Sequence, residues 1–221
     1  MTRTNRRYCR VRGWGAGAYR AIVMTGILLG PVGATAGVIP PVDDQVKRWN
    51  WFADKVFALH EQQLKDRSVR REERTGGYAG MPGFYREVTF YDAKTGDLLS
   101  RVQWETAQPQ NVHSLEVYVR DKKGRVIRDY GASYLPTTRN APIQTLINLH
   151  GYADGLHAFR EFDASGNRIF EKCTGQYKGK DVELALTEED FLDQKGQRPS
   201  ALYNACFEGI ATSPGEFFRP H

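Results

Sequence analysis

Four side chains of the types that bind metal ions or transfer protons lie within 12 residues of one another. They are His150, Asp154, His157 and Glu161. The residues after Gly155 alternate like a strand, so His157 and Glu161 point to the same side of it. We expect Asp154 in the preceding turn and His150 at the end of a short helix. The pattern predicts a metal or proton-transfer site, and the alternative is four ordinary surface or turn residues.

Two tryptophans, Trp51 and Trp104, are candidate binding residues in a chain with 12% aromatic residues. In the helix expected near the N-terminus, Trp49 and Phe52 lie on the apolar stripe, whereas Trp51 falls beside it. A tryptophan in that position can flank a binding groove, because aromatic side chains dominate recognition surfaces. The alternative is that these tryptophans cover the rim of the core.

Sequence motifs that would define a reaction on their own are missing. The stretch from Gly175 to Asp181 has three residues between its glycines, where a phosphate-binding P-loop has four. Asp181 also takes the place of the required Ser or Thr. The chain has no Gly-x-Ser-x-Gly, His-Glu-x-x-His or Cys-x-x-Cys motif. We therefore predict no cofactor and do not favour an enzyme.

Residues 1–36 have the features of a cleavable signal peptide. Six arginines and no acidic residue accompany an apolar run at residues 21–29, and Ala-Thr-Ala at 34–36 provides a cleavage site. We expect a cut after Ala36, a single domain at 37–221, and a periplasmic or secreted protein. The alternative is an uncleaved membrane anchor at 21–42, although its glycines and prolines make a poor spanning helix.

The positive charge of the chain belongs to this N-terminal segment. The whole chain has 31 basic and 26 acidic residues, and residues 37–221 have 25 basic and 26 acidic residues. This balance gives no electrostatic reason to expect nucleic-acid binding. A local basic patch is expected on the last turns of the first helix, at Lys65, Arg67, Arg70, Arg71 and Arg74. It predicts peripheral contact with a membrane or an acidic partner, and the alternative is a solvated helix end.

The cysteines indicate the same compartment as the N-terminal segment. Cys9 falls within residues 1–36, which leaves Cys173 and Cys206 as an even pair. In an oxidising compartment two such thiols usually form a disulfide, and we predict this bond. The alternative is two separate buried thiols.

Local patterns predict an α+β fold. An amphipathic helix is expected at 43–73, followed by a glycine-rich joint at 76–83. Alternating residues then predict a curved antiparallel meander of about seven or eight strands. Three turns start with Asp and end with Gly, at 92–96, 121–124 and 163–166. They resemble the Asp-x-x-Gly hairpin repeats of YD-type proteins, and the resemblance covers the turns alone.

Short helices are expected at 140–150, at 187–196 and after Ser200. The predicted disulfide then fastens the last of these helices to the strand that carries Cys173. The leading functional hypothesis is an exported, non-enzymatic binding or accessory module for a protein or cell-envelope partner. The alternative is a metal-assisted hydrolase that uses the cluster between His150 and Glu161.

Overall fold

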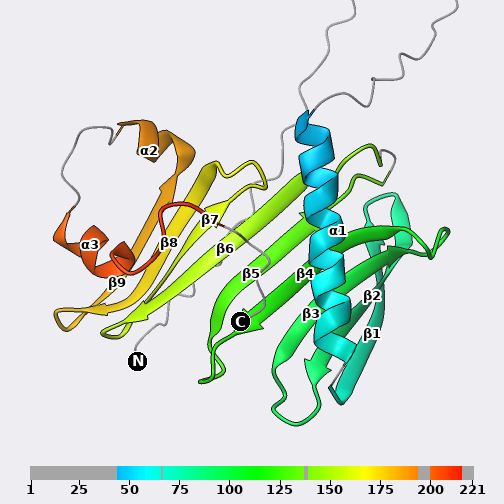
Figure 1. Cartoon of the computed structure of the whole chain (residues 1–221), viewed down its shortest axis with the longest axis horizontal. Coiled ribbons are helices and arrows are strands. Elements are labelled where there is room, and N and C mark those ends of the chain that lie inside the picture. The colour runs from blue at the N-terminus through cyan, green and yellow to red at the C-terminus, as the bar shows by residue number, and fades with distance from the viewer. Residues whose placement is uncertain (1–43, 66, 137–138, 194–199, 216–221) are drawn as a thin grey trace, which may run out of the picture. The chain divides into compact units, whose positions relative to one another are not determined.

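The computed structural model describes residues 44–65, 67–136, 139–193 and 200–215. In this part of the chain nine antiparallel strands form one open sheet, and their order in the sheet is their order in the sequence (Figure 1). The strands are β1 (Val69–Tyr78), β2 (Met81–Asp92), β3 (Leu98–Glu105), β4 (Val112–Arg120), β5 (Val126–Ser133), β6 (Gln144–Ala153), β7 (Leu156–Phe162), β8 (Arg168–Tyr177) and β9 (Lys180–Thr187). The helices are α1 (Asp44–Lys65), α2 (Glu188–Asp193) and α3 (Ala201–Phe207). The signal peptide predicted at 1–36 lies outside the described residues.

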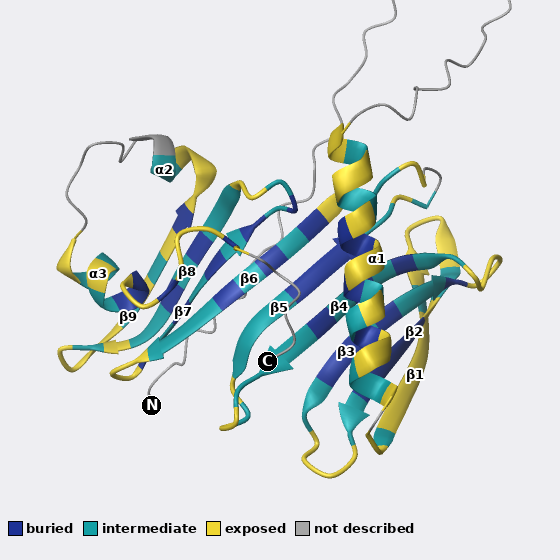
Figure 2. Cartoon of the chain, viewed as in Figure 1, coloured by how far each residue is buried: buried dark blue, intermediate teal, exposed yellow. Residues whose placement is uncertain are grey.

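Helix α1 covers one face of the sheet, across β3 to β6. Its apolar stripe is buried in that interface through Phe52, Ala53, Val56 and His60. The strands meet it with alternating buried residues such as Val102, Leu115, Val117 and Ile147. Figure 2 shows this burial along α1, where buried and exposed parts of the helix follow one another. The predicted α+β class therefore fits the structure, in which an amphipathic helix packs on an antiparallel sheet.

The boundaries of the first helix were predicted wrongly. The chain leaves α1 at Lys65, and residues 69–78 form β1, which pairs with β2 from Val69↔Asp92 to Tyr78↔Met81. The glycine-rich joint is therefore the end of a hairpin. Sequence periodicity failed here because β1 is an edge strand whose residues are almost all exposed, so it has no apolar alternation.

The helix predicted at 140–150 is also wrong, because residues 144–153 form β6. Ile143, Leu146 and Ile147 have helical spacing, but the buried residues of β6 are Thr145, Ile147 and Leu149, with a period of two. Pairing with β5 on one side and β7 on the other overrides the local preference. With β1 and β6 included, the sheet has nine strands rather than the predicted seven or eight.

The C-terminal part of the sheet is covered on the same face by α3. Ser200 caps this helix by accepting a hydrogen bond from the Tyr203 amide, as predicted. The predicted disulfide is present and joins Cys173 of β8 to Cys206 of α3. Just after the helix, Ile210 packs against Gly151 of β6. No helix in the described ranges is both long and apolar enough to cross a membrane.

Candidate functional site

The sheet has one face covered by helices and one open face, and the open face carries His150 and His157. Along β6 the covered positions are Thr145, Ile147 and Leu149, so His150 points to the open face. On β7, His157 and Glu161 also point there, because Ala158 and Phe162 are buried under the helices. The strand alternation therefore places His157 and Glu161 on one side, as predicted.

A chain of hydrogen bonds links three strands on this face. Nε2 of His150 lies 2.5 Å from Oδ2 of Asp129 on β5. Nδ1 of His150 lies 3.0 Å from Nε2 of His157 on β7. Asn148 holds the other oxygen of Asp129, since its amide donates to Oδ1 at 2.7 Å. The two imidazole planes are inclined by 12° with centroids 5.3 Å apart, so the rings meet edge to edge through their nitrogens.

The donor and acceptor roles in this chain follow from its carboxylate. An ionised Asp129 only accepts, so His150 donates to it through Nε2. When both rings are neutral, Nδ1 of His150 then accepts the Nε2 proton of His157. This leaves Nδ1 of His157 as the remaining acceptor of the chain. Burial, and then the neighbouring His150, lower the pKa of His157 below its usual range, which favours its neutral form.

Two predicted members of the cluster, Asp154 and Glu161, lie beside this chain of hydrogen bonds rather than in it. Asp154 lies in the turn between β6 and β7 with a left-handed backbone, at φ of 48°. Glu161 lies on the open face opposite Asn148. Burial, and then the charge of Asp129, raise the pKa of Glu161 above its usual range. Asp129 was missed, because only the strand register brings it next to His150.

The arrangement holds a proton better than a metal ion. Nitrogens that meet edge to edge share one hydrogen between them, whereas metal ligands converge on a common point. Among the described residues, no group of three or more His, Cys, Asp or Glu side chains could hold a metal ion. The metal site that the sequence predicts at His150, Asp154, His157 and Glu161 stays a prediction.

An open hollow adjoins the end of the histidine chain. It has a volume of about 490 Å³, and His157, Tyr152, Asp154 and Thr174 are among the residues that line it. The imidazole of His157 stacks on the phenol ring of Tyr152, with centroids 4.6 Å apart and planes inclined by 7°. The Arg125 guanidinium also lies over the Tyr152 ring, 4.9 Å from its centroid. The hollow thus places the His157 imidazole, with Nδ1 as its acceptor, next to polar and aromatic side chains.

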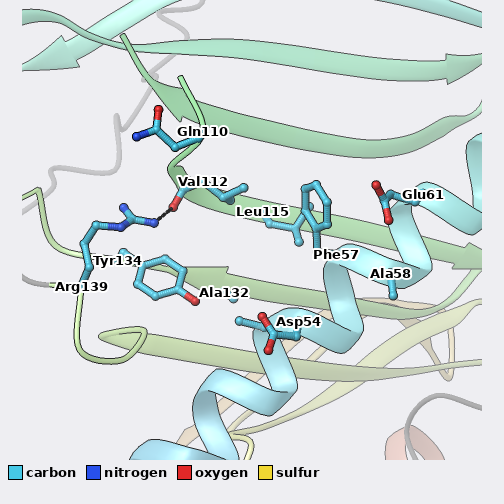
Figure 3. Close-up of a pocket in the computed structure, with 11 residues that line it drawn as sticks. Asp54, Phe57, Ala58, Glu61, Gln110, Val112, Leu115, Ala132, Tyr134 and Arg139 are labelled. Atoms are coloured by element: carbon cyan, nitrogen blue, oxygen red, sulfur yellow. Dashed lines mark hydrogen bonds between the residues drawn. The ribbon is translucent and has the colours of Figure 1, made fainter. Parts of the chain in front are cut away.

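The covered face has a second kind of site, a groove along one side of α1. One section of it, of about 450 Å³, lies between Phe57 of the helix and Val112 and Leu115 of β4 (Figure 3). Its polar rim includes Tyr134 and Arg139. Figure 3 shows the Arg139 guanidinium reaching the Val112 carbonyl, to which it donates.

The charged groups at this rim already interact with other groups of the protein. Arg139 forms an ion pair with Glu105, with Nη1 and Oε1 2.7 Å apart. Its guanidinium also lies over the Tyr134 ring, 4.8 Å from the centroid. Burial, and then the carboxylate of Asp54, raise the pKa of Tyr134, so its hydroxyl stays protonated.

The second section of the groove, of about 700 Å³, begins where Phe57 ends the first. Phe57 and Glu61 line both sections, so the two follow the same side of α1. Trp104 of β3 and the buried Phe90 of β2 form its apolar floor. The candidate binding residue Trp104 therefore lies in a groove. Trp51 lies elsewhere, 51% exposed and under the ammonium group of Lys55.

The five basic residues predicted as a helix-end patch are divided between the helix and an edge strand. Lys65 is the last residue of α1, and Arg71 of β1 lies opposite Phe90 of β2. Both basic residues therefore belong to the covered face, where they line the second section of the groove. The other three form ion pairs: Arg67 with Asp92, Arg70 with Glu72 and Arg74 with Glu87. Within the described ranges, neither Lys65 nor Arg71 forms an ion pair.

No family model, curated protein or solved structure matches this chain. Functional assignment therefore depends on the geometry of the two sites.

Proposed function

We propose that the protein is an exported, non-enzymatic binding module that holds an apolar ligand from the cell envelope in the groove between α1 and the sheet. The observation that carries the proposal is the pair of hollows on either side of Phe57. Their volumes, about 450 and 700 Å³, fall within the range of about 300–1,000 Å³ that is typical of ligand pockets.

The lining of the groove supports this proposal. Ligand pockets are lined mainly by apolar and aromatic side chains, with a few polar groups that orient the ligand. Here Phe57, Trp104 and Leu115 supply the apolar walls, and Tyr134 supplies a protonated hydroxyl at the rim. The walls come from α1, β3 and β4, which the packed core holds in place. Such a groove is therefore formed before its ligand arrives.

Export is the second part of the proposal. The features of residues 1–36 support a periplasmic or secreted location. The Cys173–Cys206 disulfide is consistent with this location, since disulfides persist in oxidising compartments. In such a compartment the ligand comes from the membrane surface or from another exported protein.

The test uses the neutral dye N-phenylnaphthylamine, whose fluorescence rises in an apolar site. Saturable binding to the full-length chain is expected. Phe57→Asp should weaken this binding about tenfold or more, because it places a charge in the apolar wall. Val112→Glu tests the same wall from β4, in case the helix variant perturbs folding. Lys55→Ala, on the exposed side of α1, is the matched control and should bind as the parent does.

The binding proposal fails if the dye does not bind the parent chain, or if all three variants bind it equally well. Circular dichroism and thermal unfolding of each variant separate loss of the groove from loss of the fold.

A second candidate function, acid–base hydrolysis, is favoured by the Asp129–His150–His157 chain. His157 would accept a proton from water through Nδ1 as the hydroxyl adds to an ester carbonyl. Its Nε2 proton would pass to Nδ1 of His150, so the positive charge would rest beside Asp129. The proton then returns to the leaving alkoxide. This mechanism uses the hydrogen-bonded chain and needs no metal ligand.

This candidate is tested by the hydrolysis of p-nitrophenyl acetate as a function of pH. Enzymatic turnover should follow the titration of His157 and disappear in His157→Gln. Asp129→Asn should lower the rate without unfolding the protein. Glu183→Gln, on an exposed position of β9, is the control. A rate equal to that of buffer for the parent chain would exclude this function for esters of this kind.

A further inference from the structure

We propose that the occupant of the groove is a long-chain fatty carboxylate, with its headgroup at Lys65 and Arg71 and its chain running past Trp104 towards Phe57. This inference rests on the proposed binding function and names its ligand class. It follows from the charge at the two ends of the groove and from the apolar path between them.

The headgroup end is defined by two cations, Lys65 and Arg71, for which the described residues provide no ion-pair partner. Lys65 and Arg71 line the second section, and in the described part of the chain neither forms an ion pair. Among the lining residues described there, Glu61 is the only carboxylate, so the section has an excess of positive charge. Helix α1 also ends at Lys65, where its free carbonyl groups carry partial negative charge. Two cations rather than one are therefore needed to attract an anion.

The other end of the groove does not offer an equivalent place for an anion. Its guanidinium, Arg139, is committed to Glu105 at 2.7 Å and to the carbonyl of Val112. The carboxylates of Asp54 and Glu61 line this section and would repel a second negative group. The charge pattern therefore orients an amphiphile with its head at Lys65 and Arg71.

Apolar side chains line the path between the two ends. Phe90 and Trp104 form the floor next to the cations, and Leu64 of α1 lines the same section. Phe57 then belongs to both sections, and Leu115 continues the wall into the first. The acyl chain would be buried along these side chains, and each methylene group removed from water strengthens the binding. A small anion without an acyl chain would gain none of this free energy of burial.

Trp104 offers a direct probe of the chain position. Stearate brominated at mid-chain quenches tryptophan on contact, whereas plain stearate does not. Titration of the full-length protein should quench part of the fluorescence. Trp104→Phe should abolish the quenching by brominated stearate while binding persists. Trp51→Phe should leave this quenching unchanged. Quenching that survives in Trp104→Phe would overturn the chain position.

The headgroup is tested with Lys65→Ala/Arg71→Ala. This variant should bind stearate about tenfold more weakly and should bind its uncharged methyl ester as the parent does. Arg70→Ala removes one charge from the opposite face of β1 and serves as the control. Equal affinity of parent and double variant for stearate would overturn the headgroup placement.

The two proposals fail in different ways. If the neutral dye binds but neither stearate nor its brominated form does, the ligand class is wrong and the groove remains a binding site. If the dye does not bind either, the proposed function fails together with this inference. Binding to vesicles of anionic phospholipid without binding of free stearate would replace the groove ligand by a membrane surface.

Discussion

Nδ1 of His60 lies 2.8 Å from Oγ of Ser100, in the middle of the interface between α1 and β3. Both side chains are buried, and His60 is only 4% exposed. Burial, and then the charge of Arg71, lower the pKa of His60 from 6.5 to about 4. The helix is therefore packed on the sheet through an imidazole that must remain neutral.

This pair makes the stability of the protein depend on pH. A lowered pKa in the folded state means that the unfolded chain binds the proton more readily, so acid favours unfolding. The contribution of His60 is complete above pH 6.5 and is lost as the pH falls through the folded pKa of about 4. Its full size is about 3 kcal/mol in the free energy of unfolding.

Urea unfolding above pH 6.5 and near pH 4 measures this effect. His60→Asn should unfold with a smaller difference between the two pH values than the parent chain. Ser100→Ala keeps the imidazole and should retain the difference. An unchanged pH dependence in His60→Asn would assign the effect to other groups.

The buried ion pair between Arg160 and Glu171 leads to a second prediction. Nε of Arg160 lies 2.5 Å from Oε1 of Glu171, which is completely buried. The guanidinium also donates to the carbonyl of Ile210, just beyond α3. Glu171→Leu should lower the free energy of unfolding by about 3–5 kcal/mol, because it leaves a buried cation without its partner.

The double variant Arg160→Met/Glu171→Leu separates charge from packing. It should recover much of the lost stability, since no buried charge remains. Urea unfolding of the parent, both single variants and the double variant completes the cycle. Additive losses would mean that the two side chains do not act as a pair.

Gly151 is predicted to be intolerant of a side chain. A Cβ atom at this position would lie 2.6 Å from Cγ1 of Ile210. Gly151→Ala should therefore cost about 1–3 kcal/mol in unfolding free energy through overpacking. Gly131→Ala is the matched control, because its Cβ would meet Leu146 at an ordinary 3.5 Å. The loss at Gly151 should shrink in an Ile210→Ala background, and a loss of the same size there would point to another cause.

Reduction of the disulfide should loosen the C-terminal end. Cys173 and Cys206 are 33 residues apart, so their bond limits the freedom of the unfolded chain. The expected contribution is about 4 kcal/mol. Urea unfolding with and without dithiothreitol measures it, and Cys173→Ala/Cys206→Ala should no longer respond to the reductant. Equal stability of the parent with and without reductant would contradict this prediction.

Much of the fold could be predicted because its signals are local. The apolar stripe of α1, the cap at Ser200 and the Asp-to-Gly turns each depend on a few neighbouring residues. In the turn at Asp121, for example, the Gly124 amide donates to the Asp121 carbonyl at 3.0 Å. The Cys173–Cys206 bond was predicted from compartment and count rather than from geometry.

The parts that could not be predicted depend on pairing between distant segments. Ile143, Leu146 and Ile147 satisfy a helical period, and only the neighbouring strands make β6 the better solution. The same limit applies to the candidate site. Alternation put His157 and Glu161 on one face, but Asp129 joins them only through the register of β5 with β6. The groove was beyond sequence reasoning because it requires the placement of α1 on the sheet.

The order of the strands has a consequence for how the molecule is made. Every strand pairs with its neighbours in the sequence, so each hairpin can close soon after its second strand is available. A chain that emerges N-terminus first can therefore assemble its sheet progressively, without waiting for a distant partner. Helix α1 emerges first but finds its place only when β3 to β6 are complete. Helix α3 follows all nine strands in the sequence, so its Cys206 joins Cys173 in a sheet that is already built.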